Sequence, residues 1–274
     1  MKDELFPEEF FAALAQVPVV NRYADFSNSA AAHRAQQRSV NRRNYQSGDS
    51  RKLVDWRTSA RREGLVVQPL QDADSPNLLI CLDRSESVIA EARDRDYAQL
   101  RLSLAFALRG LNVGSKVHVI AGDQSIQLDS IGQLPLFQEF LKSVFLNKDL
   151  RSDVDFSIAP HCSFDEIIVL SDPWVNPSNY SSAAVLAKHL RCLLLFTNRE
   201  LNLPKQKLEL QCVETGEKQL VDFSQTSPQQ QLNSFVERQE QVLTRMAFET
   251  SHIECPSFQQ STQLINLSRE HLLR

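Results

Sequence analysis

The chain has 274 residues, of which 42% are hydrophobic and 23% charged, and its formal net charge is −4. These proportions are typical of a globular protein with a substantial core and exclude a largely disordered chain. No stretch approaches the roughly 18 apolar residues of a membrane helix, and the acidic start MKDELFPEEFF lacks the apolar core of an export signal. We therefore expect a cytoplasmic protein with no membrane insertion.

Residues 1–64 are expected to form an N-terminal accessory region that begins with a short helix at residues 8–16. The second half of this region is strongly basic, because residues 34–62 contain nine basic residues and two acidic ones. This segment therefore carries about +7, and the rest of the chain about −11. A segment of this kind either contacts an anionic partner or forms an internal ion-pair network.

Within the basic segment, apolar, acidic and turn-forming residues alternate with the arginines. Tyr45 and Trp56 are large side chains that require burial, and aspartates can accept paired hydrogen bonds from arginine. We interpret the block as a folded, ion-paired element docked against the following domain. Its structural residues are Tyr45, Gly48, Asp49, Arg51, Asp55, Trp56, Arg57, Ser59 and Arg61. The exposed basic rim of Arg42, Arg43 and Arg62 is the candidate partner-binding surface.

Residues 65–274 show the alternation of an α/β domain, with a mainly parallel sheet and helices on both faces. Continuous apolar runs predict buried strands at residues 77–82, 166–170 and 192–196. An alternating strand at 116–121 turns into a short partner at 125–128, and a hairpin is predicted from residues 208–213 and 219–223. Helical spacing predicts helices over residues 89–109, 136–145, 180–190 and 229–248. The tail from residue 255 is expected to add an edge strand.

Two of the predicted core strands end in an aspartate, Asp83 and Asp172. Asp83, Ser85 and Ser87 form a D-x-S-x-S pattern directly after a buried strand, where ligands of such sheets bind. Carboxylate and hydroxyl oxygens suit Mg²⁺ or Mn²⁺, so these four residues are candidate metal ligands. The alternative is that the serines cap the next helix and Asp83 accepts backbone hydrogen bonds.

Enzymatic patterns are weak in this sequence. A phosphoaspartyl hydrolase would carry a second carboxylate two residues after Asp83, where Ser85 stands. The P-loop, the dinucleotide-binding glycine turn and the nucleophile elbow are all missing from the sequence, which has only seven glycines. No nucleophile and base can be paired, so we expect no enzyme and no catalytic residues.

The pattern R-x-x-Y-x-x-G-D-x-x-R-x-x-D-W-x-x-S-A-R, followed by a strand and D-x-S-x-S, resembles a known bacterial family. This is the von Willebrand factor A-like family called domain of unknown function fifty-eight, whose members commonly accompany MoxR-type AAA+ ATPases. The resemblance spans roughly residues 38–270. It implies a von Willebrand A-type (Rossmann-type) sheet with a metal-ion-dependent adhesion site.

The resemblance carries over to this chain residue by residue. Asp83, Ser85 and Ser87 match the first motif of the adhesion site, and Asp172 matches its late aspartate. The family's middle motif supplies a threonine, but residues 149–164 contain none, and Ser152 and Asp153 are the nearest candidates. Further departures are Arg84 and Glu86 inside the first motif, and Val88 where relatives often carry Met.

The sequence therefore predicts a non-enzymatic adaptor that acts with a MoxR-type ATPase to assemble, remodel or activate a client complex. Two alternatives remain open at this stage. A nucleic-acid-binding protein would use the arginine-rich segment 34–62, although the interleaved Asp and Trp argue against it. A metal-dependent phosphoester hydrolase would use Asp83 and Asp172. The client protein and the oligomeric state are not predicted.

Overall fold

The computed structural model describes 5–18, 43–44, 59, 65–67, 76–89, 93–147, 154–160, 162–174, 176–201, 203–211 and 216–273. The chain divides into two compact units, which are treated separately below. One unit comprises residues 1–19 together with 76–274, and the other comprises residues 20–75. This division differs from the predicted boundary at residue 64, because the first helix belongs to the larger unit.

The smaller unit contains a two-residue antiparallel pair, β1 (Arg43–Asn44) with β2 (Val66–Val67). Ser59 supports this pair, since its Oγ accepts a hydrogen bond of 2.8 Å from the Val66 amide. Val66 itself is buried. The other residues of the predicted basic block, and with them its ion pairs, lie outside the described residues.

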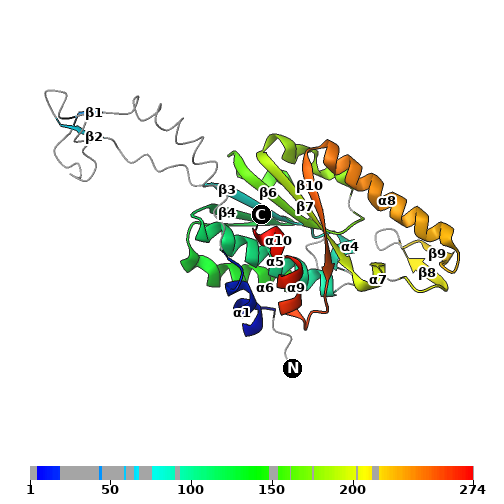
Figure 1. Cartoon of the computed structure of the whole chain (residues 1–274). Helices are drawn as coiled ribbons and strands as arrows, with labels where there is room; N and C mark the ends of the chain where they lie inside the picture. Colours follow the sequence, from blue (N-terminus) through cyan, green and yellow to red (C-terminus); the bar gives the residue numbers. More distant parts are fainter. Residues whose placement is uncertain are drawn as a thin grey trace. The chain divides into compact units, whose positions relative to one another are not determined.

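The larger unit is built on a six-stranded sheet, whose strands are drawn as arrows in Figure 1. Its order is β10–β7–β6–β3–β4–β5, and all neighbours are parallel except β4 and β5, which form an antiparallel hairpin. The strands are β3 (Asn77–Leu82), β4 (Lys116–Ala121), β5 (Gln124–Leu128), β6 (Phe164–Ser171), β7 (Ala187–Thr197) and β10 (Phe248–Cys255). A separate antiparallel hairpin pairs β8 (Lys207–Gln211) with β9 (Lys218–Asp222).

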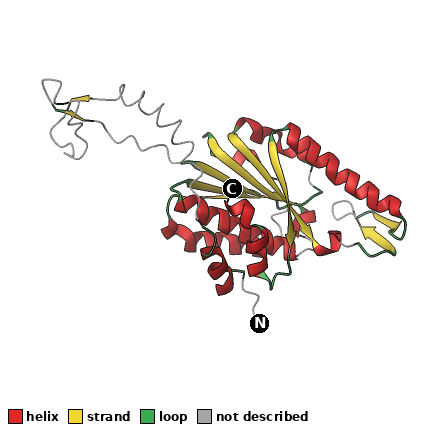
Figure 2. Ribbon diagram, viewed as in Figure 1, coloured by secondary structure: helices red, strands yellow, loops and turns green. Residues whose placement is uncertain are grey.

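Helices cover both faces of this sheet (Figure 2). One face carries α1 (Glu8–Ala15), α5 (Arg93–Asn112), α6 (Leu134–Leu146), α9 (Ser261–Leu267) and α10 (Arg269–Leu273). The other face carries α8 (Thr226–Arg245) and the 3₁₀ segments η3 (Phe156–Ile158) and η4 (Pro177–Val185). Short turns of helix stand at α4 (Glu86–Ile89), η2 (Ile131–Gln133) and α7 (Asn198–Leu201).

The core forms as two layers because side chains of a strand alternate between the faces of the sheet. In β3, Leu78, Ile80 and Leu82 pack towards α5, whereas Leu79 and Cys81 pack towards η4. Both layers are apolar, which explains why the strand reads as an unbroken hydrophobic run. The predicted α/β fold with a mainly parallel sheet and helices on both faces is thus confirmed, and the arrangement is consistent with a von Willebrand A-type domain.

Two predicted elements are wrong, and a third has different bounds. Residues 180–190 form no α-helix: η4 ends at Val185, and β7 begins at Ala187. The helix predicted over 229–248 ends earlier, at Arg245, because Ala247 takes a left-handed φ of 67° and Phe248 opens β10. The edge strand ends at Cys255 instead of beginning there, and the tail beyond it is helical.

The first helix also differs from the expected arrangement. We placed it in an accessory region, but Phe10 and Leu14 of α1 join the apolar core shared with α5 and α9. Arg101 of α5 reinforces this packing by donating a hydrogen bond of 2.8 Å to the Leu5 carbonyl. Within the described part of the chain, no helix has both the length and the apolar character needed to cross a membrane.

Candidate functional site

The candidate site lies where β3 and β6 end side by side. From β3 the chain crosses to β4 on one side, and from β6 it crosses to β7 on the other side. The two connections cover opposite faces of the sheet, α5 on one and η4 on the other. In open α/β sheets, ligands bind beyond the carboxyl ends of adjacent strands whose connections diverge in this way. We use the name crevice for the strand-end region around Asp83, Ser85, Ser87 and Asp172, all of which are buried except the half-buried Ser87.

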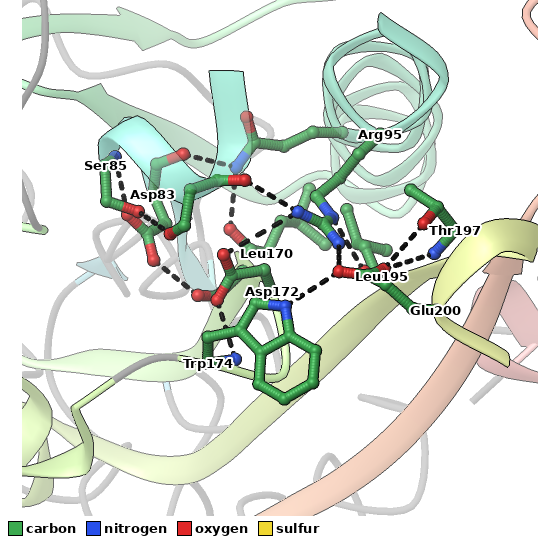
Figure 3. A network of polar contacts seen from close by, with 12 residues as sticks. Asp83, Ser85, Arg95, Leu170, Asp172, Trp174, Leu195, Thr197 and Glu200 are labelled. Carbon is green, nitrogen blue, oxygen red and sulfur yellow. Dashed lines mark hydrogen bonds and ion pairs between the residues drawn. The ribbon is translucent and has the colours of Figure 1, made fainter. Parts of the chain in front are cut away.

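Asp83 follows β3 and is held by donors from several elements (Figure 3). Its Oδ1 accepts a hydrogen bond of 2.9 Å from the Ser85 amide, and its Oδ2 accepts from the hydroxyls of Ser171 and Tyr180. The residue is 1% exposed. Both carboxylate oxygens of Asp83 are therefore engaged inside the protein, and one of them fixes the turn that carries Ser85.

Ser85 and Ser87 bring their hydroxyls together next to this carboxylate. Their Oγ atoms lie 3.1 Å apart, a distance at which either hydroxyl can donate to the other. Ser85 opens the turn before α4 and Ser87 lies in its first turn. The alternative interpretation is met in part, because Asp83 Oδ1 accepts a backbone hydrogen bond from the Ser85 amide.

Asp172 supplies the second carboxylate, at the end of β6. Its Oδ1 accepts a hydrogen bond of 2.9 Å from the Trp174 amide, which closes a local turn. Its Oδ2 is buried and has no hydrogen-bond partner among the described residues, although Nη1 of Arg95 lies 3.7 Å away. An unsatisfied buried carboxylate oxygen is costly, so this atom is the most reactive feature of the crevice towards a cation or a proton.

The electrostatics of the crevice agree with that geometry. The pKa of Asp172 is raised to about 6, first by burial and then by the neighbouring Asp83 carboxylate, while Arg95, the Ser87 hydroxyl and the Trp174 amide act to lower it. Burial and Asp83 likewise raise the pKa of Tyr180 well above its ordinary value, so Tyr180 remains a neutral donor. The ionised form of Asp172 is therefore disfavoured by burial and by Asp83 more than its donors offset.

Arg84 stands inside the D-x-S-x-S motif but does not face the hydroxyls. It is wholly buried, and its Nη1 donates hydrogen bonds to Asp96 at 2.6 Å and to Gln99 at 3.1 Å, both in α5. Gln99 in turn donates from Nε2 to the carbonyls of Asp83 and Leu170, at 2.7 and 2.8 Å. Arg84 and Gln99 thus join the ends of β3 and β6 to α5, and the charge of Arg84 is neutralised by Asp96.

Sequence reasoning missed Arg95, Glu200 and Trp174, which complete the site. Arg95 is 2% exposed and forms an ion pair with Glu200 of α7. Glu200 also accepts hydrogen bonds from Trp174 Nε1 at 2.7 Å and from the Thr197 amide at 2.7 Å. Burial acts to raise the pKa of Glu200, but Arg95 and these donors outweigh it, so the pKa is lowered and the group stays ionised. Arg95 and Trp174 lie 105 and 26 residues from Glu200 in the sequence, which is why spacing could not reveal this pairing.

The donors fit a hard divalent cation, which the resemblance implies. The Ser85 and Ser87 hydroxyls and Asp172 Oδ2 would hold Mg²⁺ or Mn²⁺, since all are hard oxygen donors and Oδ2 is unsatisfied. Asp83 would position the loop, because its own oxygens are engaged. A bound ion would supply an open coordination position for an anionic group of a binding partner. The middle-motif candidates Ser152 and Asp153 lie outside the described residues.

The structure thus brings together all four predicted site residues, Asp83, Ser85, Ser87 and Asp172, beyond the ends of β3 and β6. Of the predicted basic rim, only the backbone of Arg43 is described, in β1. Arg42 and Arg62 lie outside the described residues. The role of the rim therefore remains a prediction from the sequence.

Comparison with known proteins matches part of this chain to one protein family. Residues 41–133 match the family model described as Protein of unknown function DUF58. This part of the chain is therefore similar to the DUF58 family. The DUF58 segment includes the basic block and the loop from Asp83 to Ser87, whereas Asp172 and Glu200 lie beyond it. No curated protein and no solved structure matches the chain.

Proposed function

We propose that this protein is a non-enzymatic interaction adaptor of the von Willebrand A type that acts in the cytoplasm of a bacterium. In this proposal it works with a MoxR-type AAA+ ATPase to assemble, remodel or activate a client complex. Its contacts lie at the strand-end face around Asp83, Ser85, Ser87 and Asp172. The basic rim at Arg42, Arg43 and Arg62 is a second contact.

One observation carries the proposal: a buried, unsatisfied carboxylate oxygen stands beside a pair of hydroxyls at a topological switch point. Asp172 Oδ2 has no hydrogen-bond partner among the described residues, and the Ser85 and Ser87 hydroxyls are 3.1 Å apart. This arrangement suits the reversible binding of an external group through a cation, because an anionic partner group can complete the coordination of a hard ion. The choice of ATPase partner rests on the family resemblance alone.

The geometry does not favour Asp83 as the nucleophile of the hydrolase alternative. Asp83 is 1% exposed and accepts hydrogen bonds from Ser85, Ser171 and Tyr180, so its oxygens are not directed at a substrate. A carboxylate nucleophile needs an accessible oxygen with a lone pair aimed at the reacting atom. The nucleic-acid alternative depends on the arginine-rich segment 34–62 and gains no support from the described residues.

The adaptor proposal is tested by measuring the complex between the full-length chain and a MoxR-type AAA+ ATPase from the same genome. The double variant Ser85→Ala/Ser87→Ala removes both hydroxyls, and Ser143→Ala is the matched control on the exposed face of α6. We expect the double variant to weaken binding by about tenfold or more, with the melting temperature unchanged, and Ser143→Ala to bind normally. If the native chain forms no complex, the ATPase partnership is wrong. If it forms one that the double variant leaves intact, the crevice is not the contact.

A further inference from the structure

Arg95 links the ends of three strands to one another. Its Nη1 donates a hydrogen bond of 2.7 Å to the Ser87 carbonyl beyond β3, and its Nε donates one of 2.9 Å to the Leu195 carbonyl in β7. Its Nη1 also lies 3.7 Å from Asp172 Oδ2, beyond β6. The guanidinium is therefore placed between both loops of the candidate site and the neighbouring strand.

The position of Arg95 makes it a rival of any cation that binds in the crevice. Asp172 Oδ2 is the unsatisfied oxygen that a metal ion would use, and it is also the oxygen that faces the guanidinium. The separation of 3.7 Å permits electrostatic attraction but is too long for a hydrogen bond. A divalent ion near Asp172 would be repelled by the positive charge of Arg95. Because Arg95 and Asp172 are both buried, the low local dielectric strengthens this repulsion.

Glu200 determines how much of the arginine's charge reaches Asp172. It pairs directly with Arg95 Nη2 and is itself held by Trp174 Nε1 and by the amide and hydroxyl of Thr197. This second carboxylate draws the guanidinium towards α7 and partly neutralises it. Arg95 is thus shared unequally between Glu200, which it contacts closely, and Asp172, which it approaches only at 3.7 Å.

We propose that Arg95 is a built-in competitor of the divalent cation at Asp172, and that Glu200 adjusts this competition by holding the arginine back. Arg95 acts here as a positioning and affinity-setting residue that would not contact the ion. The inference rests on the cation site of the proposed function, and it names the residues that limit occupancy of that site. It requires no particular partner protein.

The test uses titration calorimetry of the full chain with Mn²⁺, comparing the native protein with Arg95→Gln and Glu200→Gln. Loss of the positive charge in Arg95→Gln should tighten Mn²⁺ binding by about tenfold. Loss of the restraining carboxylate in Glu200→Gln should weaken it by about threefold or more, because the arginine is then free to pair with Asp172. General loosening of the loops would weaken binding in both variants, so the opposite signs separate competition from damage.

Arg101→Gln serves as the matched control, since Arg101 is a buried arginine of the same helix whose hydrogen bonds go to the Leu5 and Phe258 carbonyls. It should leave Mn²⁺ affinity unchanged. The inference is overturned if Arg95→Gln is folded and binds Mn²⁺ no more tightly than the native chain, or if Glu200→Gln binds more tightly. Absence of Mn²⁺ binding in every variant also overturns it. The adaptor proposal would survive that result if the ATPase complex still forms.

Discussion

Replacing Asp172 by Asn should change how the stability of the sheet unit depends on pH. The carboxyl is fully buried, and its pKa is raised from 3.8 to about 6, first by burial and then by Asp83. Because the folded state holds this proton more tightly than the unfolded state, the ionised group lowers the free energy of unfolding. Asparagine keeps an oxygen for the Trp174 amide but carries no charge to bury.

The magnitude follows from the displacement of the pKa. A pKa raised from 3.8 to about 6 corresponds to about 3 kcal/mol at the upper limit, and about 2–3 kcal/mol of it develops between pH 4 and pH 7. The sign is unusual for an aspartate: below the unfolded pKa this cost is absent, and it is fully present once the pH exceeds about 6. The native protein should therefore lose more stability than Asp172→Asn as the pH rises from 4 to 7.

Urea denaturation at several pH values in this range, with a chelator present, measures the effect. Trp174 fluorescence in a Trp56→Phe background reports on the site, since these are the two tryptophans of the chain. Asp123→Asn, at an exposed turn position between β4 and β5, is the control and should follow the native profile. Parallel profiles for the native protein and Asp172→Asn would refute the claim that Asp172 is an uncompensated buried carboxylate.

Two further predictions concern the arginines in and before the site. Arg84→Met should lower the free energy of unfolding by about 3 kcal/mol, because it leaves Asp96 buried without its cation. Adding Asp96→Leu should recover much of this loss, and urea denaturation of the double-mutant cycle would contradict the pairing if the effects were simply additive. Arg42→Glu with Arg43→Glu should weaken the complex with the ATPase while leaving the melting temperature nearly unchanged. A large loss of stability with normal binding would instead show that these arginines are structural.

The strands at the centre of the sheet could be predicted from the sequence because burial on both faces leaves a recognisable pattern. β3 and β4 have the predicted bounds, since each is an apolar run that ends at a polar residue or a turn. The candidate ligands followed from the same logic: Asp83 and Asp172 end neighbouring strands, and parallel strands end at one edge. At Asp83 and Asp172, the local sequence pattern therefore predicts the position that the residues take in the sheet.

The elements that failed are those in which tertiary contacts overrode local preference. Residues 187–189 lie in the polar, partly exposed start of β7, and they look helical because alanines and leucines surround them. They become strand because their backbones pair with β6, from Phe164↔Ala187 onwards. Strand formation depends on such neighbours more than helix formation does. For the same reason, the pairing of Arg95 with Glu200, over a separation of 105 residues, left no local signal.

Arg84 and Arg95 show that the position of a charged residue in a sequence motif does not predict whether its charge faces the site. Arg84 lies between the motif residues, yet its charge is directed to Asp96 and away from the hydroxyls. Arg95 lies outside the motif, yet it is the arginine that faces Asp172. With Asp83, Asp172 and Glu200 set against Arg95, the groups around the crevice remain predominantly negative when ionised. A partner carboxylate would therefore meet like charge there unless a cation lay between them, so any acidic contact at this face has to depend on the ion for which Arg95 competes.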